Sequence, residues 1–500
     1  MFISFFMSTV LYAEDWPQAF GPNGDFTVNG KAVDSFSVSM DENILWRTPM
    51  PSTGQGTPII SNGRIFVTSH ERMERDSEMG TDIVGICLDA KTGNKLWERK
   101  IPGTRTTDLS SLFSDNTAAS PVSDGERVVF MSVGGTIASF DFEGKELWTH
   151  KWTPFGRHHA RAHEPILYDG MVIVAHTPKY DLPIEATTKA GSKALGRGKE
   201  YWNFLRAYNL KTGKLLWQAE AGTSVHSTSM LGQLAKGKLA ILTGRGGGHQ
   251  PPEEPYGLSM IDLTSGKSIW DQSIKGYPAA QNASWNKNGV YFFAGSMHQS
   301  LSSRTGKMKK EASIFEKVTI TKWNGRDYET MNDQTLKKSK KPITYFTNIL
   351  IGEYHYFRSF EGFMIGRVNL KNGKVEYLEV PAQVIREKGK EEEVLWGKTV
   401  PNDMKNADGF KATMDKRNAG SGWGHVSSAP PIVVGELIYF PTMAGMVYVL
   451  KWNAEILDEK ALVSINDLGR AGETWSLSGL VYADGKIFAR TLKEMICIGR

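Results

Sequence analysis

The chain has 500 residues, of which 40% are hydrophobic and 23% are charged. This composition is that of a folded globular protein, and it excludes a disordered chain, in which few hydrophobic residues accompany a large net charge. The net charge of +5 is too small to indicate a nucleic-acid partner, so we interpret the lysine-rich stretch 337–341 as a solvated loop. With only two cysteines, the chain is neither a disulfide scaffold nor a cysteine-based metal site.

Residues 1–13 form an apolar, uncharged run that stops at Glu14 and Asp15. A run of about a dozen apolar residues is too short to cross a bilayer. It is typical of the hydrophobic part of a signal peptide cleaved after Ala13, although no positive charge precedes it; an N-terminal strand or tail is the alternative. We therefore expect a periplasmic or extracellular protein with no transmembrane segment once the signal is removed, and an N-terminal extension over residues 14–41.

A repeated turn sequence organises the rest of the chain. In each copy Asp or Asn accepts backbone hydrogen bonds, Gly supplies a positive φ, and a Trp follows in an outer strand and packs back on the sheet. Two weaker copies occupy 303–307 and 369–374. The clear copies are DAKTGNKLW (89–97), DFEGKELW (141–148), NLKTGKLLW (209–217) and DLTSGKSIW (262–270).

Short apolar strands, split by hairpin turns, precede these copies, as in 57–69, 120–133, 164–176 and 430–441. Seven such units end near residues 100, 151, 220, 273, 312, 380 and 465. Residues 477–500 supply three further strands, and residues 42–49 supply an isolated outer strand. Joining the two removes exposed sheet edges. The predicted fold over residues 42–500 is all-β: an eight-bladed β-propeller of four-stranded antiparallel blades, closed by pairing the N-terminal strand with the C-terminal blade.

The two cysteines and two long insertions complete the predicted architecture. Cys87 and Cys497 fall at equivalent third-strand positions in neighbouring blades, and we favour two separate buried thiols over a disulfide. The insertions 311–343 and 381–419 are long, charged and without a repeat pattern. Insertions of this length are lids, binding elements or solvated decorations.

Unusual loops are predicted to gather on one face, which we call the funnel face. The connections between blades, and those between second and third strands, open there, whereas the repeated turns open on the opposite face. His163 or His226 as a base, with Arg161 and Arg245 on a carboxylate, would suit proton abstraction. Candidate ligands of a divalent metal are His158, His163, Glu164 and His226. Further candidate ligand-binding residues are Arg157, His159, His249, Trp423, His425, Arg470 and Trp475. Alternatively, these histidines bond loop backbones and these tryptophans fill the core.

The repeat motif, the closing strand and the opening DWPQAFGPNG (15–24) resemble the secreted PQQ-like propeller proteins. That group includes the propeller lipoprotein of the outer-membrane β-barrel assembly machine and the quinoprotein alcohol dehydrogenases. The resemblance implies the propeller but no particular activity. In the dehydrogenases a disulfide of adjacent cysteines lies against the quinone; this chain has no adjacent cysteines, no haem motif and no clear set of calcium-binding and catalytic aspartates, so PQQ is not expected.

Three functions remain as hypotheses. The favoured one is a ligand-binding or protein-interaction scaffold that recognises an envelope protein or a glycan through the funnel face. The alternative is a carbohydrate-active enzyme, a lyase or hydrolase, that acts on acidic glycans with the histidines and arginines of the funnel. A quinoprotein dehydrogenase is the least favoured of the three. The sequence identifies neither the ligand nor the oligomeric state.

Overall fold

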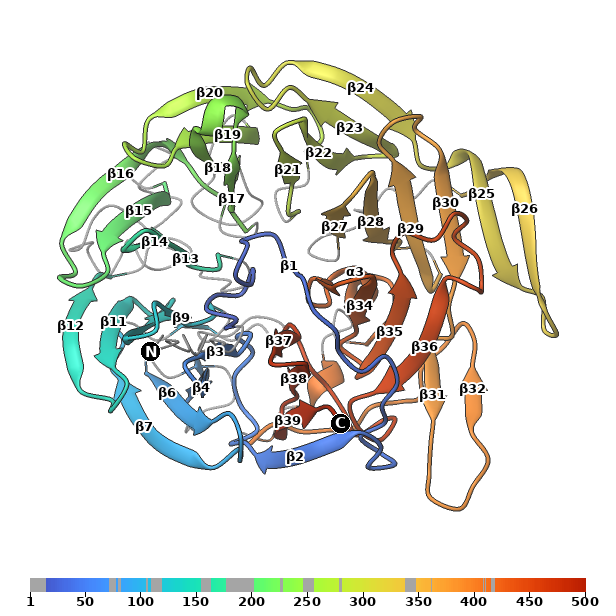
Figure 1. The fold of residues 1–500 in the computed structure, drawn as a ribbon, viewed down its shortest axis with the longest axis horizontal. Helices are drawn as coiled ribbons and strands as arrows, with labels where there is room; N and C mark the ends of the chain where they lie inside the picture. Colours follow the sequence, from blue (N-terminus) through green and yellow to red (C-terminus); the bar gives the residue numbers. More distant parts are fainter. Residues whose placement is uncertain are drawn as a thin grey trace, which may run out of the picture.

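The computed structural model places the chain in eight blades around a central axis (Figure 1). This confirms the predicted fold class. The structure describes residues 15–71, 78–79, 82–104, 107–108, 119–153, 163–176, 202–224, 228–245, 256–277, 281–337, 348–360, 362–407, 409, 411–414 and 419–500. Helix is confined, within these residues, to α3 (Trp423–Val426) and the 3-10 turns η2 (Ala235–Gly237) and η3 (Ala412–Met414).

The first four blades are each a four-stranded antiparallel sheet. Blade one holds β3 (Ile59–Ser61), β4 (Arg64–His70), β6 (Ile83–Asp89) and β7 (Lys95–Ile101). Blade two holds β9 (Val122–Ser123), β10 (Arg127–Ser132), β11 (Thr136–Asp141) and β12 (Glu146–Lys151). Blade three holds β13 (Ile166–Tyr168), β14 (Met171–His176), β15 (Phe204–Asn209) and β16 (Leu215–Gly222). Blade four holds β17 (Met230–Gln233), β18 (Leu239–Arg245), β19 (Gly257–Asp262) and β20 (Ser268–Ser273).

The next three blades repeat this order. Blade five holds β21 (Ser284–Asn286), β22 (Gly289–Ala294), β23 (Met297–Leu301) and β24 (Met308–Ser313). Blade six holds β27 (Asn348–Ile351), β28 (Tyr354–Arg358), β29 (Met364–Asn369) and β30 (Val375–Glu379). Blade seven holds β33 (Ile432–Val434), β34 (Leu437–Pro441), β35 (Met446–Lys451) and β36 (Leu462–Asp467). A short pair, β5 (Glu78–Met79) and β8 (Thr107–Asp108), lies outside the blades.

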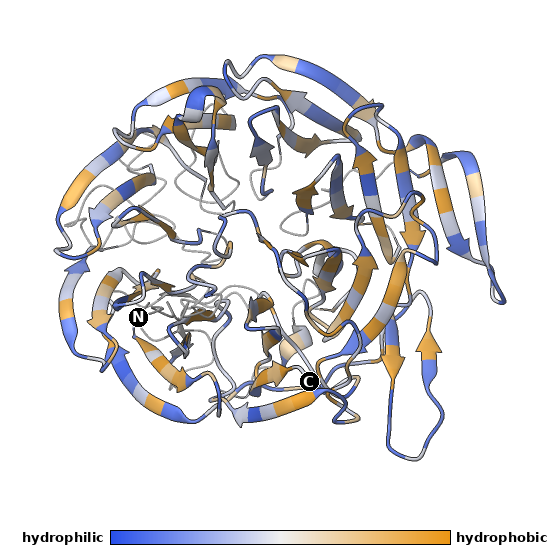
Figure 2. Ribbon diagram, viewed as in Figure 1, coloured by the Kyte–Doolittle hydropathy of each residue, from blue (hydrophilic) through white to orange (hydrophobic). Residues whose placement is uncertain are grey.

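Blade eight closes the propeller with strands from both ends of the chain. Its first three strands are β37 (Val481–Ala483), β38 (Lys486–Arg490) and β39 (Glu494–Ile498). Its outer strand is β2 (Ile44–Pro49), which pairs antiparallel with β39. The predicted closure is therefore confirmed. Figure 2 shows apolar residues concentrated in the inner strands, while the outer strands carry polar stretches toward solvent.

The N-terminal segment 15–28 crosses the centre of the propeller (Figure 1). Trp16 exchanges two backbone hydrogen bonds of 2.9 Å with Ile60 in blade one. Gln18 accepts a hydrogen bond from the Leu167 amide in blade three (2.9 Å). The strand β1 (Thr27–Val28) then pairs parallel with β33 in blade seven. These contacts lie near the ends of the first strands, next to the turns that join the first and second strands of each blade. Those turns open on the face opposite the funnel face, so the segment closes the axis on that opposite face.

The first predicted insertion extends a blade outward. Its strands β25 (Glu316–Trp323) and β26 (Tyr328–Thr335) form a hairpin, and β25 pairs parallel with β30 at the outer edge of blade six. In Figure 1 this hairpin lies at the periphery of the molecule. The described part of this insertion therefore does not act as a lid over the axis.

The second predicted insertion contributes a separate two-stranded sheet of β31 (Gln383–Ile385) and β32 (Glu393–Leu395). Trp396, which follows β32, stacks on Trp323 of the first insertion with ring centroids 5.1 Å apart and planes 5° apart. The two insertions thus support one another outside blade six.

The repeated turn joins neighbouring blades as well as neighbouring strands. Gly144, in the β11–β12 turn, has a φ of 80°, and a Cβ there would lie 3.0 Å from the Trp97 indole of the preceding blade. The Trp97 Nε1 donates to the Phe142 carbonyl of the same turn (2.7 Å). The same type of bond runs from Trp148 to Leu210 and from Trp270 to Ser303. The motif tryptophan therefore packs between two blades, and not on its own sheet alone.

Cys87 on β6 and Cys497 on β39 are both free and buried, which confirms the prediction of separate thiols. Burial raises the pKa of each thiol to about 12. Because the thiolate is the reactive form, we expect neither cysteine to react with a thiol reagent in the folded protein and both to react in denaturant. Mass spectrometry after timed labelling measures this directly. Fast modification of either thiol in the native protein would contradict the structure.

Candidate functional site

An axial cavity of about 60 Å³ lies where the inner strands meet the N-terminal segment. Ala19 and Phe26 of that segment line one end of it. The space holds a few water molecules or a group of a few heavy atoms. The remaining lining residues stand in or just before the first strands of six blades: Gln55, Thr57, Glu164, Thr228, Asn282, Ser428, Ala429, Pro430, Ile432, Leu477, Gly479 and Leu480.

A recurring hydrogen bond joins neighbouring blades around this cavity. The donor is the backbone N–H of the residue two positions before the first strand of one blade. The acceptor is the side chain at the equivalent position of the next blade. The bond forms from Ser120 to Glu164 (2.7 Å), from Thr228 to Asn282 (2.8 Å) and from Gly479 to Thr57 (2.9 Å). The lining side chains are therefore part of the blade packing as well as the wall of a cavity.

Glu164 is the one ionisable residue among the described residues that line the cavity. Its Oε2 accepts the hydrogen bond from the Ser120 amide. Burial raises the pKa of Glu164 to about 7, and the Ser120 hydrogen bond opposes only part of this rise. At neutral pH the carboxyl is thus close to half ionised, which makes it the most readily titrated group of the cavity.

We expect the pKa of Glu164 to appear in the stability of the protein. Because the folded state holds this proton more tightly than the unfolded state, the free energy of unfolding falls as the pH rises from about 4.5 to about 7. Glu164→Gln removes that loss, so the variant should become more stable than the wild type across this range, by up to about 3 kcal/mol. Denaturant unfolding of both proteins at several pH values measures the difference.

The difference curve isolates Glu164 from its neighbour His163. Burial lowers the pKa of His163 to about 3, so that residue removes stability as the pH falls below 6.5, the opposite direction. Subtracting the free energy of unfolding of the variant from that of the wild type at each pH cancels the contribution of His163. Glu143→Gln, a change to an exposed carboxylate in the β11–β12 turn, serves as the control. If the free energies of unfolding of Glu164→Gln and the wild type changed in parallel with pH, the raised pKa of Glu164 would be contradicted.

His163 lies beside Glu164 in the connection to blade three. The distance between its Nε2 and the Thr223 Oγ1 is 3.5 Å. With a pKa lowered to about 3 by burial, its imidazole is neutral at physiological pH. A group with so low a pKa is a weak general base, because a base works best when its pKa lies near the operating pH.

Arg245, at the end of β18, already has a carboxylate partner within its own blade. Its Nη1 lies 3.5 Å from the Asp271 Oδ1, and the Ser259 hydroxyl donates to the same carboxylate oxygen (2.6 Å). The guanidinium is buried. Its charge is therefore balanced by blade four itself, which reduces what it offers to an external carboxylate.

The candidates near blade seven separate into buried and exposed residues. His425, on α3, is buried, and its ring packs edge-on against Phe363 with centroids 5.3 Å apart. Trp475 is 1% exposed and packs in a small core with Met404. Arg470 stands in solvent and faces Glu473 at 3.8 Å. Of these three predicted ligand-binding side chains, Arg470 is the one open to a partner.

Several predicted site residues cannot be compared with the structure. The backbone of Trp423 belongs to α3, while its side chain is outside the described part. Within the described residues, no group of three or more His, Cys, Asp and Glu side chains is arranged to hold a metal ion. The residues that lie outside the described part of the chain are Arg157, His158, His159, Arg161, His226 and His249.

Comparison with known proteins gives the family. The family model described as outer membrane protein assembly factor BamB matches residues 39–117 and 86–291, which together span just over half of the chain. The chain belongs to this PQQ-like propeller family. No curated protein sequence matches it.

Solved structures of other PQQ-like propellers share the fold at low identity. The quinohemoprotein alcohol dehydrogenase ADHIIG from Pseudomonas putida HK5 is 12% identical, with a TM-score of 0.52, and the match covers 97% of this chain and 80% of that one. The quinohemoprotein alcohol dehydrogenase from Comamonas testosteroni is also 12% identical, with a TM-score of 0.50 and the same coverage. At this identity the likeness establishes the propeller and nothing more.

The described residues of this PQQ-like propeller do not include the adjacent cysteines that the resemblance to the quinoprotein dehydrogenases would require. The cysteines lie in blades one and eight, each inside a strand, and not side by side. We therefore derive no redox step. Among the described residues, no helix is long and apolar enough to cross a membrane.

Proposed function

We propose that this PQQ-like propeller is an exported scaffold that binds a ligand or a partner protein of the cell envelope through its funnel face. The observation that carries the proposal is the axial cavity. It is closed at one end by the N-terminal segment, so a ligand group reaches it from the funnel face. Its described lining joins polar side chains from several blades, including Glu164 and Asn282. An export signal over residues 1–13 is part of the same proposal.

A scaffold role has more support than the alternative of a lyase or hydrolase on acidic glycans. The alternative relies on His163 as a base and on Arg245 to neutralise a substrate carboxylate. Burial makes His163 a weak base, and Asp271 already balances the charge of Arg245. Binding of a glycan or a protein needs neither property. Two of the four candidate metal ligands, His158 and His226, lie outside the described part of the chain, and His226 is also the remaining candidate base.

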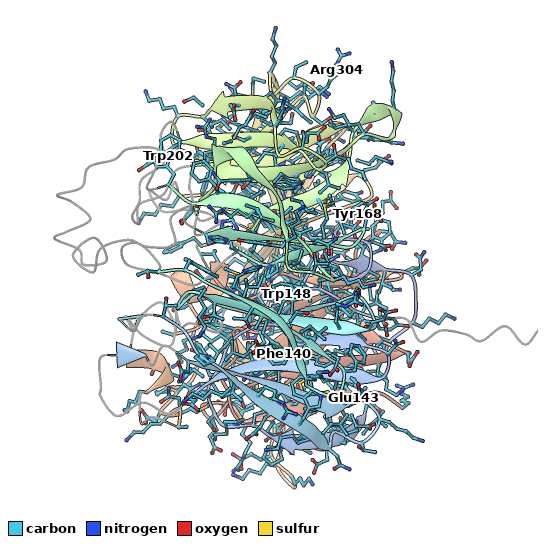
Figure 3. The ribbon with its side chains drawn as sticks, turned by 90° about the vertical axis from the view of Figure 1, so that its left-hand side faces the viewer. Phe140, Glu143, Trp148, Tyr168, Trp202 and Arg304 are labelled. Carbon is cyan, nitrogen blue, oxygen red and sulfur yellow. The ribbon has the colours of Figure 1, made fainter. Side chains whose placement is uncertain are left out.

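Site-specific photo-crosslinking from the two faces tests the proposal. A crosslinker replaces Arg470, exposed in the connection between blades seven and eight, or Arg304, exposed in the β23–β24 turn of the opposite face. Figure 3 shows the two faces edge-on, with Trp202 toward the funnel face and Glu143 toward the other. We expect a discrete crosslinked species in the cell envelope from position 470 and none from position 304. Equal products from both positions would overturn the proposal.

Purified glycans supply the second half of the test. Binding of neutral and uronate-containing oligosaccharides, measured by ligand-observed NMR, identifies a glycan ligand if position 470 captures no protein. The same samples report on catalysis, because a lyase produces unsaturated uronates that absorb in the ultraviolet. Turnover of an acidic glycan would favour the enzyme over the scaffold.

A further inference from the structure

A pocket of about 370 Å³ lies between the second insertion and the connection that joins blades seven and eight. Residues 397–403 of the insertion line it, together with Gln383 of β31. Ala444, in the β34–β35 turn, and Trp475 line it from the side of the blades. Since a turn between second and third strands opens on the funnel face, this pocket belongs to the face that the proposed function uses.

Hydrogen bonds fix the insertion to the blades beside this pocket. The Asn402 Nδ2 donates to the Thr474 carbonyl (2.9 Å), in the connection between blades seven and eight. The Arg386 Nη2 donates to the Ile465 carbonyl of β36 (2.8 Å), and β31 lies beside β36 in Figure 1. Because these bonds form within the chain, the pocket has its shape before a ligand enters.

Gln383 leaves hydrogen-bond donors of this pocket unused. The residue is 2% exposed, and its Oε1 accepts a hydrogen bond from the Val400 amide (2.8 Å). Since a backbone N–H only donates, the oxygen end of the side-chain amide is the one that meets Val400. Among the described residues, the Nε2 of Gln383 and the buried Nε1 of Trp475 have no acceptor. Buried donors almost always have a partner, so this lining has donors to offer to a ligand.

The charges of the described lining favour a ligand with a negative charge. Its charged residues are Lys398 and Asp403. The Asp403 Oδ1 accepts a hydrogen bond from the Lys411 Nζ (2.6 Å), which balances this carboxylate. Lys398 is exposed, forms no ion pair with a described residue, and stands two residues before Val400, which Gln383 contacts. An ammonium group and a side-chain NH₂ together suit a carboxylate, whose two oxygens only accept.

The size and the remaining side chains of the pocket narrow the ligand to an acidic sugar. A volume of about 370 Å³ admits about a dozen heavy atoms, if each takes the ~30 Å³ of a liquid water molecule. The hydroxyls of Thr399 and Ser421 suit sugar hydroxyls, while Val400 and Pro401 offer apolar surface to the C–H groups of the ring. An amino acid fits less well, because its ammonium group needs an acid and Asp403 is already paired.

We infer that this pocket binds a single uronate unit, with Lys398 and the Gln383 Nε2 as the partners of its carboxylate. The inference rests on the proposed function, because it names the chemistry that one part of the funnel face recognises. It concerns binding and includes no bond cleavage. The uronate is either a free sugar acid or the end of an acidic glycan, since both present the same carboxylate.

Calorimetric titration of the full chain with sugars tests this inference. Glucuronate and galacturonate are the probes; glucose and galactose, which have a CH₂OH group in place of the carboxylate, are the matched references. We expect saturable binding of at least one uronate, about tenfold or more tighter than that of its neutral counterpart. Affinity should fall as the salt concentration rises, because the contact with Lys398 is exposed. Equal binding of the acidic and the neutral sugars, or no binding of either uronate, overturns the inference.

Two variants decide which residues hold the carboxylate. Gln383→Glu keeps the acceptor for Val400 but replaces the NH₂ group by a second oxygen, so uronate affinity should fall by about tenfold or more. Lys398→Gln changes an exposed residue, so the variant should fold as the wild type does, and its uronate affinity should fall by about threefold or more. Lys211→Gln, in the β15–β16 turn of the opposite face, removes the same charge and should bind as the wild type does. Unchanged affinity in Lys398→Gln, or an equal loss in Lys211→Gln, overturns the inference.

The crosslinker at position 470 separates this inference from the proposed function. If neither uronate binds but position 470 still captures a partner, the uronate inference is wrong and the scaffold proposal stands. If the crosslink and the uronate binding are both absent, both proposals fail. If a uronate binds, a uronate-terminated disaccharide is compared with the free sugar acid, and the tighter binder identifies the source.

Discussion

Replacement of Trp97 by alanine is expected to lower the free energy of unfolding by about 3–5 kcal/mol. The indole is 8% exposed and lies between blades one and two, in one core cluster with Phe66, Phe130 and Phe140. Its Nε1 also donates to the Phe142 carbonyl of the next blade. The change therefore opens a cavity and breaks a contact between blades at the same time. Denaturant unfolding with a two-state fit measures the loss, provided that separate spectroscopic probes give coincident transitions.

Leu96→Ala is the matched control for Trp97→Ala. Leu96 is the neighbouring residue of the same strand but is 48% exposed, so its truncation should change the free energy of unfolding by about 0.5 kcal/mol or less. The Trp97 and Leu96 variants together test whether the motif tryptophan holds adjacent blades. Equal effects of the two changes would mean that the indole contacts contribute little.

The fold was predictable because the same turn sequence recurs from blade to blade. The sequence Thr92-Gly93 and its equivalents recur with Asp or Asn before them and Trp after them, and this pattern needs one local conformation each time. The outer strand at 44–49 was predictable for the same reason, since it carries the same Leu-Trp pair. The route of residues 15–28 was not. Its hydrogen bonds are made with strands up to about four hundred residues away, and no periodic pattern in DWPQAFGPNG indicates them.

The candidate site was only partly predictable. Glu164 was identified for its position beside His163, as a metal ligand, whereas the structure relates it to Thr57, Ser120 and Thr228 at equivalent positions of other blades. This equivalence can be found in the sequence by comparing the residues that precede each inner strand. The sequence could not identify Asp271 as the partner of Arg245. The register of the strands and the direction of the side chains decide which acid lies opposite a given residue in a sheet.

Loss of the buried carboxylate of Glu376 is the second change with a large expected effect. Arg367, on β29, is fully buried, and its Nε donates to Glu376 on β30 at 2.7 Å. Glu376→Ala leaves the guanidinium without a counter-ion inside blade six, so we expect the free energy of unfolding to fall by about 3–5 kcal/mol. Glu98→Gln is the control, since the exposed pair of Glu98 with Lys95 should contribute about 1 kcal/mol or less.

The arrangement around Arg367 explains why Glu376→Ala should be so costly and what would contradict that expectation. Arg358, on the neighbouring strand β28, is equally buried, but none of the described acids pairs with it. Its Nη1 donates to the Pro441 carbonyl at 3.1 Å, and its guanidinium lies 5.7 Å from the Tyr448 ring. Within the described residues, blade six thus holds one guanidinium through carbonyl and ring contacts alone. If Arg367 were held in the same way, by the Ala454 carbonyl at 2.7 Å and the Tyr354 ring at 4.2 Å, Glu376→Ala would behave like Glu98→Gln. A loss of about 3 kcal/mol or more instead requires that the ion pair itself balances the charge.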